Sequence, residues 1–212
     1  MSIRFIYFDL PFWRAEASRL ALFLGGIPFE DIRVASDEFQ EMKATNQLPY
    51  NQLPILEIDG KVIAQSLAIA RFCGKKSGFY PVNSAINAAL VDELLDSVAQ
   101  VTELFSASLD ESDAEKKAKL RYTIATHTLP MWLGFLERRV ATNGGALYCI
   151  GEDMTIADLA LWRLLGWFRS GKLDGIPTDC IDLYPRLCDH FRYMDNNSSI
   201  RTWMRDNYSD QQ

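Results

Sequence analysis

Signals for β-strands are confined to the first third of this 212-residue chain, and this asymmetry limits the folds that it can adopt. Short runs of β-branched and aromatic residues, typical of strands, occur at residues 3–8, 29–34, 55–58 and 61–64. Helical periodicity alternates with them, at residues 15–24, 37–45 and 66–75. This order predicts an α/β domain in which a small sheet packs against helices.

A stretch without periodicity at residues 77–84, which contains glycine and proline, is the expected domain boundary. Beyond it strand signals nearly vanish, and apolar residues recur at helical spacing. We therefore predict an α/β domain at residues 1–78 and an all-helical domain at residues 84–212. A chain of this length can bury a substantial core without metals or disulfides.

Long apolar stripes predict the helices of the second domain. One stripe runs from Ile86 to Phe105, and another runs from Ala114 to Val140, where Pro130 is expected to kink the helix. Two further helices are predicted near the end of the chain, at residues 185–195 and 200–207.

Thr155 and Asp158 have the spacing of a capping box, in which the side chains at the start of a helix bind its free backbone N–H groups. We assign these two residues a structural role at the start of a helix that continues through Trp167. The apolar positions of this helix run nearly all the way round it, which predicts that it lies at the centre of the helical domain.

Composition and charge exclude several classes of function. A net charge of −6 offers no basic surface for nucleic acid or for an anionic membrane, and the long apolar runs are interrupted by Arg163 and Arg169. The first residues lack the features of a signal peptide, so a cytoplasmic location is expected. The four cysteines and two histidines show no metal-ligand spacing, which predicts reduced thiols and no metal site.

Four short sequence features point to a ligand site. They are Tyr7 at the end of the first strand, Arg14 at the start of the first helix, and the segments Gln52-Leu53-Pro54 and Gln65-Ser66. In order and spacing they resemble the N-terminal domain of cytosolic glutathione transferases, most closely the sigma-like class that includes glutathione-dependent prostaglandin D synthases. The resemblance implies a thioredoxin-like glutathione-binding domain, a helical domain that contributes the electrophile pocket, glutathione as co-substrate, and a homodimer.

The chemistry of this family requires the glutathione thiol as a thiolate, because the thiolate is the nucleophile. The resemblance makes Tyr7 the hydroxyl that donates a hydrogen bond to the sulfur, and Arg14 the cation beside it. Lowering the thiol pKa by roughly two units requires about 3 kcal/mol in favour of the anion. Taken alone, Tyr7 is also a common strand residue, and Arg14 could simply pair with Glu16 or with a surface carboxylate.

The resemblance assigns the other glutathione contacts to loops and helix starts. Pro54 matches a cis-proline, which would let the Leu53 backbone pair with the cysteinyl backbone of glutathione, with Gln52 beside it. Gln65 and Ser66 start a helix whose N–H groups suit the γ-glutamyl carboxylate, although Ser66 is also an ordinary cap and Pro54 could be trans at the start of a strand.

Three further positions match the family pattern with altered residue types. Phe39 and Lys43 occupy the positions of the tryptophan and lysine that bind the glycyl carboxylate, and Phe39 lacks the indole donor. Gln100 stands where the partner subunit would supply a carboxylate, and Asp92 and Asp96 nearby could be a solvated acidic face.

The predicted pocket for a hydrophobic electrophile contains Phe12, Trp13, Phe105 and Tyr208, and the turn Asp9–Trp13 is one residue longer than the family pattern. The expected activity is conjugation of glutathione to hydrophobic electrophiles in detoxification, or isomerisation or reduction through the same thiolate. The alternative is a non-catalytic, crystallin-like protein on the same fold, which binds glutathione or a hydrophobic ligand or has a structural role. A thiol-disulfide oxidoreductase would need a cysteine near the first turn, where this chain has none.

Overall fold

The computed structural model describes residues 2–143, 145 and 147–208, and the chain begins with a four-stranded sheet. Its strands are β1 (Ile3–Phe8), β2 (Glu30–Val34), β3 (Ile55–Ile58) and β4 (Lys61–Ala64), in the order β2-β1-β3-β4. Strand β2 pairs parallel with β1, whereas β3 pairs antiparallel with β1 and with β4. This register sets Tyr7, near the end of β1, opposite Arg33 of β2.

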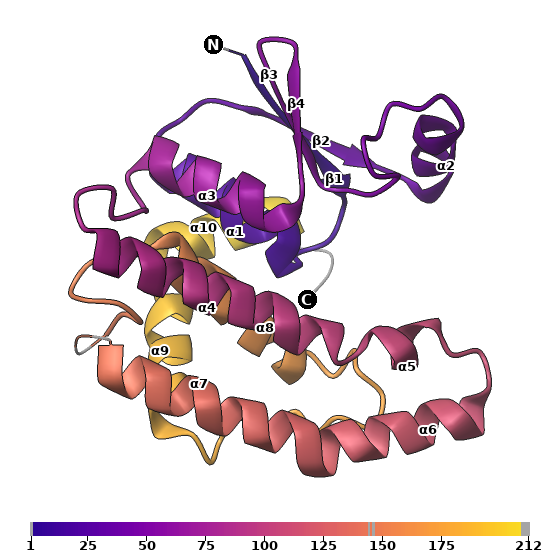
Figure 1. The fold of residues 1–212 in the computed structure, drawn as a ribbon, viewed down its shortest axis with the longest axis vertical. Helices are drawn as coiled ribbons and strands as arrows, with labels where there is room; N and C mark the ends of the chain where they lie inside the picture. Colours follow the sequence, from indigo (N-terminus) through magenta and orange to yellow (C-terminus); the bar gives the residue numbers. More distant parts are fainter. Residues whose placement is uncertain (1, 144, 146, 209–212) are drawn as a thin grey trace.

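Three helices accompany the sheet: α1 (Trp13–Leu24), α2 (Ser36–Ala44) and α3 (Ser66–Ser77). Figure 1 shows α1 and α3 side by side between the sheet and the helical part, with α2 apart from them. Phe5, Leu20, Leu56 and Ile69 from these elements have no exposed surface. Burying side chains of this size contributes about 1.5–3 kcal/mol each. The predicted order of strands and helices is confirmed.

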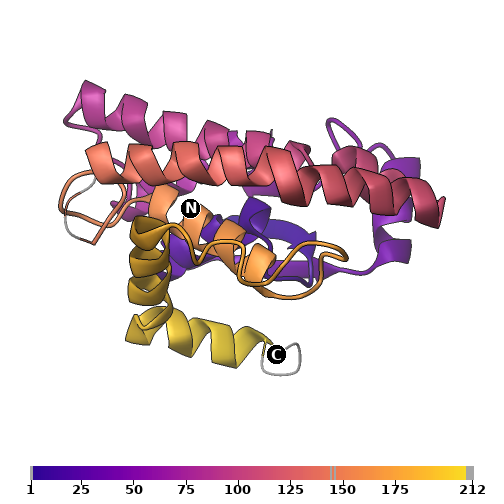
Figure 2. The ribbon, with the colours of Figure 1, turned by 90° about the horizontal axis from the view of Figure 1, so that it is seen from below.

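The remaining elements are helical, as predicted. They are α4 (Ala85–Glu103), α5 (Ser106–Asp110), α6 (Ala114–Thr123), α7 (Leu129–Asn143), α8 (Ile156–Arg169), α9 (Pro185–Asp195) and α10 (Ser198–Tyr208). Figures 1 and 2 show α4 alongside the continuous rod of α6 and α7, which runs in the opposite direction. Within the described part of the chain, no helix is both long and apolar enough to cross a bilayer.

Helix α8 lies at the centre of the helical part and confirms the sequence prediction. It packs against α1, α4 and α9, and side chains from all round it, among them Leu161, Leu164 and Phe168, have no exposed surface. Figure 2 shows α8 enclosed by the other helices. Because α8 also contacts α1, it carries the first turn of α1 on a buried and rigid support.

A distortion of the helix lies just before Pro130. Residues Ile124–Thr128 form one π-helical turn, and the N–H of Leu129 bonds to the carbonyl of Ile124. Proline has no N–H to donate, so a local change of hydrogen-bond pattern next to it leaves fewer carbonyls without partners. A π-turn thus stands between α6 and α7, whereas the predicted kink at Pro130 stays a prediction.

Asp158 is fully buried and receives hydrogen bonds from three parts of the chain. One carboxylate oxygen accepts from the backbone N–H of Thr155 at 2.7 Å and from its hydroxyl at 2.9 Å. The other accepts from the backbone N–H of Cys149 at 2.7 Å and lies 3.1 Å from His190 Nε2. The structural role expected for Asp158 thus extends beyond the start of α8 to the preceding loop and to α9.

Burial acts to raise the pKa of the Asp158 carboxyl, but the hydrogen bonds and charge of His190 and the bonds from the Cys149 and Thr155 backbone outweigh it. The pKa of Asp158 therefore lies below its usual 3.8. The carboxylate is ionised in the folded protein over the whole neutral range.

Helix α10 is attached to the α/β part by buried polar side chains of α1. The carboxylate of Glu16 accepts hydrogen bonds from the indole N–H of Trp203 and from the hydroxyl of Tyr208. Arg19, which has no exposed surface, bonds to Asp31 at 2.8 Å and to Tyr208 Oη at 3.2 Å. These contacts join the last helix of the described structure to the first helix of the chain.

Candidate functional site

An open cleft of about 760 Å³ lies where the α/β part meets α4 and α5. Six of the residues predicted to contact glutathione line it: Arg14, Gln52, Leu53, Pro54, Gln65 and Ser66. They come from the first turn of α1, the loop before β3 and the start of α3. The fold thus brings into one cleft residues that are separated by up to about fifty positions in the sequence.

The loop before β3 contributes buried backbone to the cleft wall. Leu53 and Pro54 are buried, and the peptide bond between them is cis, as the resemblance implied. Asn51 has a φ of 53°, a left-handed conformation that asparagine tolerates better than most residues.

The start of α3 has an unusual backbone conformation. Gln65 is the N-cap residue, with a φ of 73° and ψ of 117°, and Ser66 is the first helical residue. The expectation that Ser66 caps this helix is therefore wrong by one position. A non-glycine residue in this region of φ and ψ is uncommon and is found most often at ligand sites. The free N–H groups at the start of α3 attract negative charge to this end of the cleft.

Tyr7 is buried near the end of β1, with only 5% of its surface exposed. Burial raises the pKa of its hydroxyl above the usual 10, while the positive charges of Arg14 and Arg19 act in the opposite direction. The Arg19 guanidinium carbon lies 5.9 Å from the centre of the Tyr7 ring. The phenol consequently keeps its proton at neutral pH and can act as a hydrogen-bond donor.

Arg14 opens α1 and forms part of the cleft wall. Its guanidinium lies 3.9 Å from Glu103 and its Cζ lies 5.9 Å from the centre of the Phe12 ring. Glu16, considered above as a possible partner, bonds instead to Trp203 and Tyr208. The contact with exposed Glu103 is long, so Arg14 can turn toward an anion in the cleft at little cost.

Helix α2 places Phe39 and Lys43 next to each other, and neither is among the described residues that line the cleft. The Lys43 ammonium lies 4.7 Å from the centre of the Phe39 ring, and that ring meets Phe8 edge to face. The contact with Phe39 holds Lys43 only weakly. Their assignment to the glycyl carboxylate stays a prediction.

Helix α4 presents Gln100 to solvent, whereas Asp92 and Asp96 are engaged within the chain. Both carboxylates lie 2.6 Å from the guanidinium of Arg71, which is on α3 and lines the cleft. Both carboxylates are solvent-exposed, as expected for an acidic face, and they also tie α3 to α4.

Two residues of the predicted electrophile pocket are not available to a ligand. Phe105 has no exposed surface and packs against Trp167 and Phe168 in the helical core. Tyr208 is buried, and its hydroxyl bonds to Glu16. Both assignments are corrected, because residues distant in the sequence cover these rings.

The other two residues assigned to that pocket lie at or near the cleft. Trp13 lines it but is buried, with 2% of its surface exposed, and its indole N–H donates to Thr102 Oγ1 at 2.8 Å. Phe12 is partly exposed and meets Trp167 edge to face. Several residues of the cleft wall were not predicted from the sequence, namely Tyr50, Arg71, Glu103, Ser106 and Asp110. Tyr50 could have been found, since it lies two positions before Gln52.

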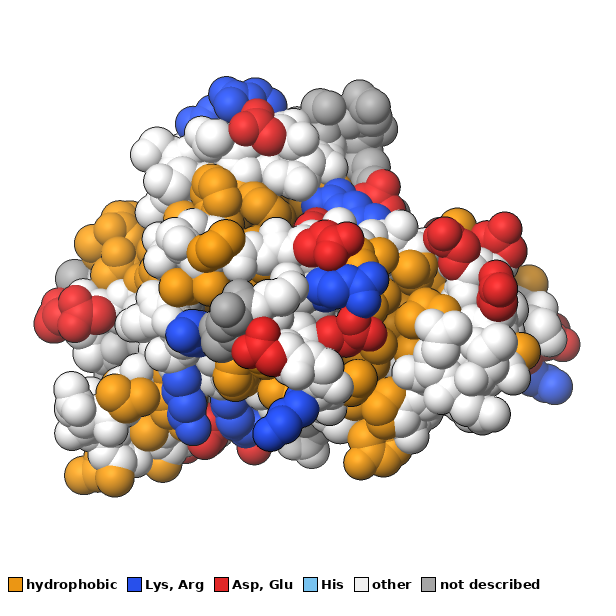
Figure 3. Space-filling view, turned by 90° about the horizontal axis from the view of Figure 1, so that it is seen from above, with side chains coloured by type: hydrophobic (Ala, Val, Ile, Leu, Met, Phe, Trp, Pro, Cys, Tyr) orange, Lys and Arg blue, Asp and Glu red, His pale blue; other side chains and the backbone are white. Residues whose placement is uncertain are grey.

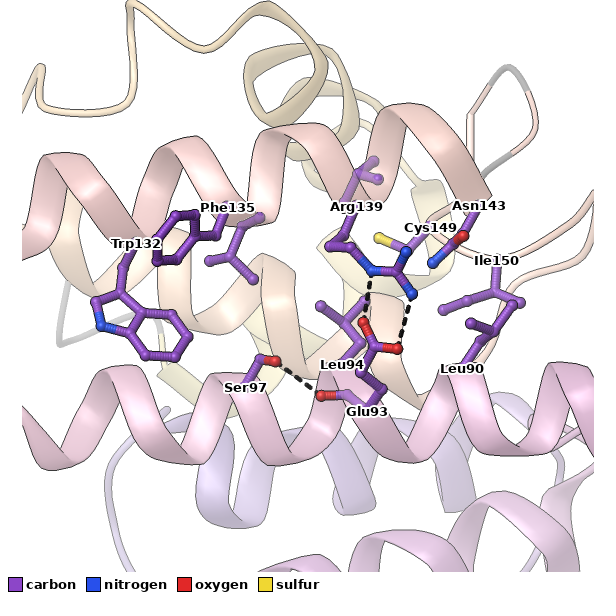
Figure 4. Close-up of a pocket in the computed structure, with 12 residues that line it drawn as sticks. Leu90, Glu93, Leu94, Ser97, Trp132, Phe135, Arg139, Asn143, Cys149 and Ile150 are labelled. Carbon is purple, nitrogen blue, oxygen red and sulfur yellow. Dashed lines mark hydrogen bonds and ion pairs between the residues drawn. The ribbon is translucent and has the colours of Figure 1, made fainter.

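A second cavity lies between α4 and α7 and has a volume of about 30 Å³ (Figure 4). Figure 4 shows Glu93 and Arg139 at its rim, where the guanidinium binds both carboxylate oxygens at 2.6 and 2.7 Å. A cavity of this size holds about one or two water molecules, which is too little for a peptide ligand. An open pocket of about 730 Å³ at α9 and α10 is comparable in volume to the cleft. The cleft is the candidate site because residues predicted from the sequence line it.

Cys149, Asp158 and His190 form a buried cluster whose side-chain ligand atoms lie within 4.8 Å of one another. From its sequence spacing His190 was predicted to have no metal-ligand partner. It meets the other two residues only because α9 packs against α8 in the folded chain. Burial raises the pKa of the Cys149 thiol well above 9, and Asp158 adds to this effect. Since the Asp158 oxygens already bind backbone N–H groups, the cluster serves as a structural junction.

Family models match both parts of the chain. The model described as glutathione S-transferase, N-terminal domain, matches residues 3–74, and the model described as glutathione S-transferase, C-terminal domain, matches residues 100–207. Among relatives, hematopoietic prostaglandin D synthase of Gallus gallus is 31% identical over 94% of this chain and 93% of its own length. S-crystallin SL11 of Nototodarus sloanii is 32% identical over 69% of this chain and 70% of its own.

Solved structures show the same fold over nearly the whole chain. Prostaglandin synthase D of Nilaparvata lugens has a TM-score of 0.83 and 27% identity, and covers 96% of this chain and 97% of its own. A monomeric glutathione S-transferase of the hookworm Necator americanus, Na-GST-3, has a TM-score of 0.78 and 28% identity, with 97% of each chain covered.

Proposed function

The chain belongs to the glutathione S-transferase family, and on that basis we propose that its cleft binds glutathione and that Tyr7 and Arg14 hold the glutathione sulfur as a thiolate. The activated thiolate then attacks small hydrophobic electrophiles. The observation that carries this proposal is the convergence of residues from α1, the loop before β3 and the start of α3 on one cleft.

Glutathione fits the cleft in chemical character. The start of α3, with Ser66 and the unusual Gln65 backbone, suits the γ-glutamyl carboxylate. The backbone of Leu53 suits the cysteinyl backbone of the tripeptide, which would bind there as a short added strand. Bound in this way, glutathione extends its sulfur toward the start of α1, where Arg14 lies.

We expect two groups to stabilise the thiolate: Arg14, which lines the cleft, and Tyr7, which is not among the described residues that line it. The protonated Tyr7 hydroxyl donates to the sulfur, and the Arg14 guanidinium adds a positive charge at the cleft wall. Together with the helix starts, these groups supply about 3 kcal/mol in favour of the anion, which lowers the thiol pKa by roughly two units. Conjugation, isomerisation and reduction all begin with this anion.

The proposal is tested by binding and turnover together. We expect the protein to be retained on immobilised glutathione and to conjugate glutathione to a chlorinated nitroaromatic acceptor. Ser66→Ala should weaken glutathione binding about tenfold, because a charged carboxylate loses a hydrogen bond. Isothermal titration calorimetry measures this change. The control is Ser77→Ala at the other end of α3, where the hydroxyl binds only the helix carbonyls of Cys73 and Gly74.

The likeness to S-crystallin SL11 favours a second candidate, a non-catalytic binding protein on the same fold. Retention on immobilised glutathione without turnover of any acceptor in a broad panel would support this candidate. Absence of retention would contradict both candidates.

We further propose a homodimer in which the α/β part of one subunit packs against α4 of its partner. Both surfaces expose large apolar side chains, with 63% of Tyr50 and 75% of Ile86 accessible. On the face seen in Figure 3, hydrophobic side chains are exposed between interspersed acidic and basic ones. Apolar surface of this kind commonly marks an interface between subunits.

Light scattering during size-exclusion chromatography should give twice the chain mass of 24.1 kDa. Ile86→Asp should shift the protein to the monomer, because it places a charge in the proposed interface. Leu183→Asp is the control, since 87% of Leu183 is exposed in the loop before α9. A wild-type mass of one chain at micromolar concentration would contradict the dimer.

The cytoplasm is the proposed location, because the four cysteines are all free thiols. Burial raises the pKa of Cys73 to about 12 and that of Cys180 to about 11, so these thiols stay protonated and inert. Free thiols persist in a reducing compartment.

A further inference from the structure

The turn between Tyr7 and Arg14 is held by the helical part of the molecule. Arg163, on α8, donates two hydrogen bonds to the carbonyl oxygen of Pro11, from Nε at 3.0 Å and from Nη2 at 2.7 Å. Pro11 lies in the middle of the turn that joins β1 to α1. The contact spans 152 residues of sequence, so no local interaction would produce it.

Arg163 is a charged donor in a contact for which a neutral donor would suffice. Among the described residues Arg163 forms no ion pair; its Cζ lies 4.8 Å from the centre of the Trp162 ring, and burial lowers the pKa of its guanidinium. The titratable groups that act on it from a distance are Glu16 on α1, Asp195 on α9 and the neutral phenol of Tyr208 on α10. Arg163 is partly buried, and withdrawing a cation even partly from water costs stability, whereas a neutral donor could bind a carbonyl without that cost.

Gly166 leaves the space that the Arg163 side chain occupies. A Cβ atom at Gly166 would lie 3.2 Å from Arg163 Nη1 and 3.6 Å from the Phe191 ring. Glycine in the interior of a helix reduces its stability, and α8 is otherwise densely packed. The helix therefore gives up stability at two positions, 163 and 166, that together allow one contact with the turn.

We infer that Arg163 is a positioning residue for the proposed glutathione site, which fixes Pro11 and thereby sets Tyr7 and Arg14 at the distance that the sulfur requires. This inference rests on the proposed function. Fixing the middle of a short turn restrains both of its ends, and small displacements of groups around a reacting atom have large effects on rate.

The inference predicts a separation between sulfur activation and glutathione affinity. The charges that act on Tyr7 are those of Arg14 and Arg19, and Arg14 follows the turn directly. The proposed contacts for the peptide backbone and the γ-glutamyl carboxylate, at Leu53 and Ser66, lie on other elements. Loosening the turn should therefore raise the pKa of the bound thiol while leaving the affinity for glutathione nearly unchanged.

The test compares Arg163→Gln, Arg163→Lys and Gly166→Ala in the full-length protein. For each variant, glutathione binding is measured by calorimetry, and kcat/KM for the nitroaromatic acceptor is measured as a function of pH. We expect Arg163→Gln to lower kcat/KM at pH 6.5 about tenfold and to move the acidic limb of its pH profile to higher pH by about one pH unit. The dissociation constant for glutathione should change less than threefold. Arg163→Lys, which keeps the charge, should recover part of the loss.

Gly166→Ala disturbs the contact between Arg163 and Pro11 without changing either residue. The added methyl group crowds the Arg163 guanidinium, so this variant should shift the pH profile in the same direction by a smaller amount. The matched control is Arg169→Gln, on the same helix, where the arginine is exposed and pairs with Asp182 at 2.7 Å. Its pH profile should equal that of the wild type.

Two failures are distinguishable. If the wild type and Arg169→Gln are active but Arg163→Gln only lowers the thermal unfolding midpoint and leaves the pH profile unchanged, Arg163 is purely structural and the inference is wrong. If the wild type itself neither binds glutathione nor turns over any acceptor, the proposed function fails first.

Discussion

Replacing Tyr7 by phenylalanine is expected to lower kcat/KM for conjugation at pH 6.5 about 100-fold. The reason is the loss of the hydrogen bond that favours the thiolate, which raises the thiol pKa by roughly two units, equivalent to about 3 kcal/mol. Because the variant is slow only for lack of ionised thiol, the difference in kcat/KM between Tyr7→Phe and the wild type should shrink as the pH rises. Near pH 9 a thiol with an ordinary pKa of about 8.5 is ionised without the help of Tyr7. Difference absorbance of the bound thiolate in the ultraviolet measures the shift directly.

The control for this experiment is Tyr122→Phe, since 67% of Tyr122 is exposed on α6. It should leave both the rate and the absorbance unchanged. Glutathione binding by Tyr7→Phe should stay within about threefold of the wild type, because the proposed peptide contacts lie at Leu53 and Ser66. A Tyr7→Phe variant that keeps wild-type activity at pH 6.5 would remove the phenol from the mechanism.

Asp158→Asn is expected to reduce the free energy of unfolding by about 3–5 kcal/mol, because the amide cannot accept on both sides. The backbone N–H groups of Thr155 and Cys149 each bind a different oxygen of Asp158, so one of them loses its acceptor inside the core. For a chain of this size the loss corresponds to a decrease of roughly 10 °C in the thermal midpoint. Urea titration and calorimetry measure the two quantities.

The pH dependence of this difference has a definite sign. The pKa of Asp158 is lower in the folded protein than its usual 3.8, so its contribution is complete above about pH 4 and is lost as the pH falls through the folded value. The stabilities of the wild type and Asp158→Asn should therefore converge below pH 3.8. Asp153→Asn, at an exposed position of the same loop, is the control and should change stability little. Equal unfolding midpoints at pH 7 would contradict the structural role of Asp158.

The parts of the fold that could be predicted from the sequence are those encoded by local periodicity. The β-branched and aromatic run at residues 3–8 and the apolar surround of α8 predicted the correct elements, because strand-forming residues and burial on all faces can be seen in the local sequence. The π-turn at Ile124–Thr128 was not predicted, because Pro130 indicates that a helix is disturbed but not which hydrogen-bond pattern replaces it.

The same distinction holds for the candidate site. Gln52, Leu53 and Ser66 belong to short motifs, and the structure places them on the cleft. Phe105 and Tyr208 were misassigned because the sequence does not show whether distant residues cover an aromatic ring. In the folded chain both rings are buried. Arg163 went unnoticed for a related reason, since only the folded chain brings it to Pro11.

The attachment of α10 to α1 has a consequence for how the protein is made. Glu16 leaves the ribosome 187 residues before Trp203 and 192 residues before Tyr208, the partners that bind its carboxylate. Until these positions have been synthesised, the Glu16 carboxylate and the Arg19 guanidinium of the nascent α/β part lack some of their hydrogen-bond partners. The incompletely folded segment can then be bound by chaperones. We therefore expect folding to be completed late and cooperatively, once α10 has been synthesised. A fragment that ends before α10 should not reach the native fold and should be degraded by proteases.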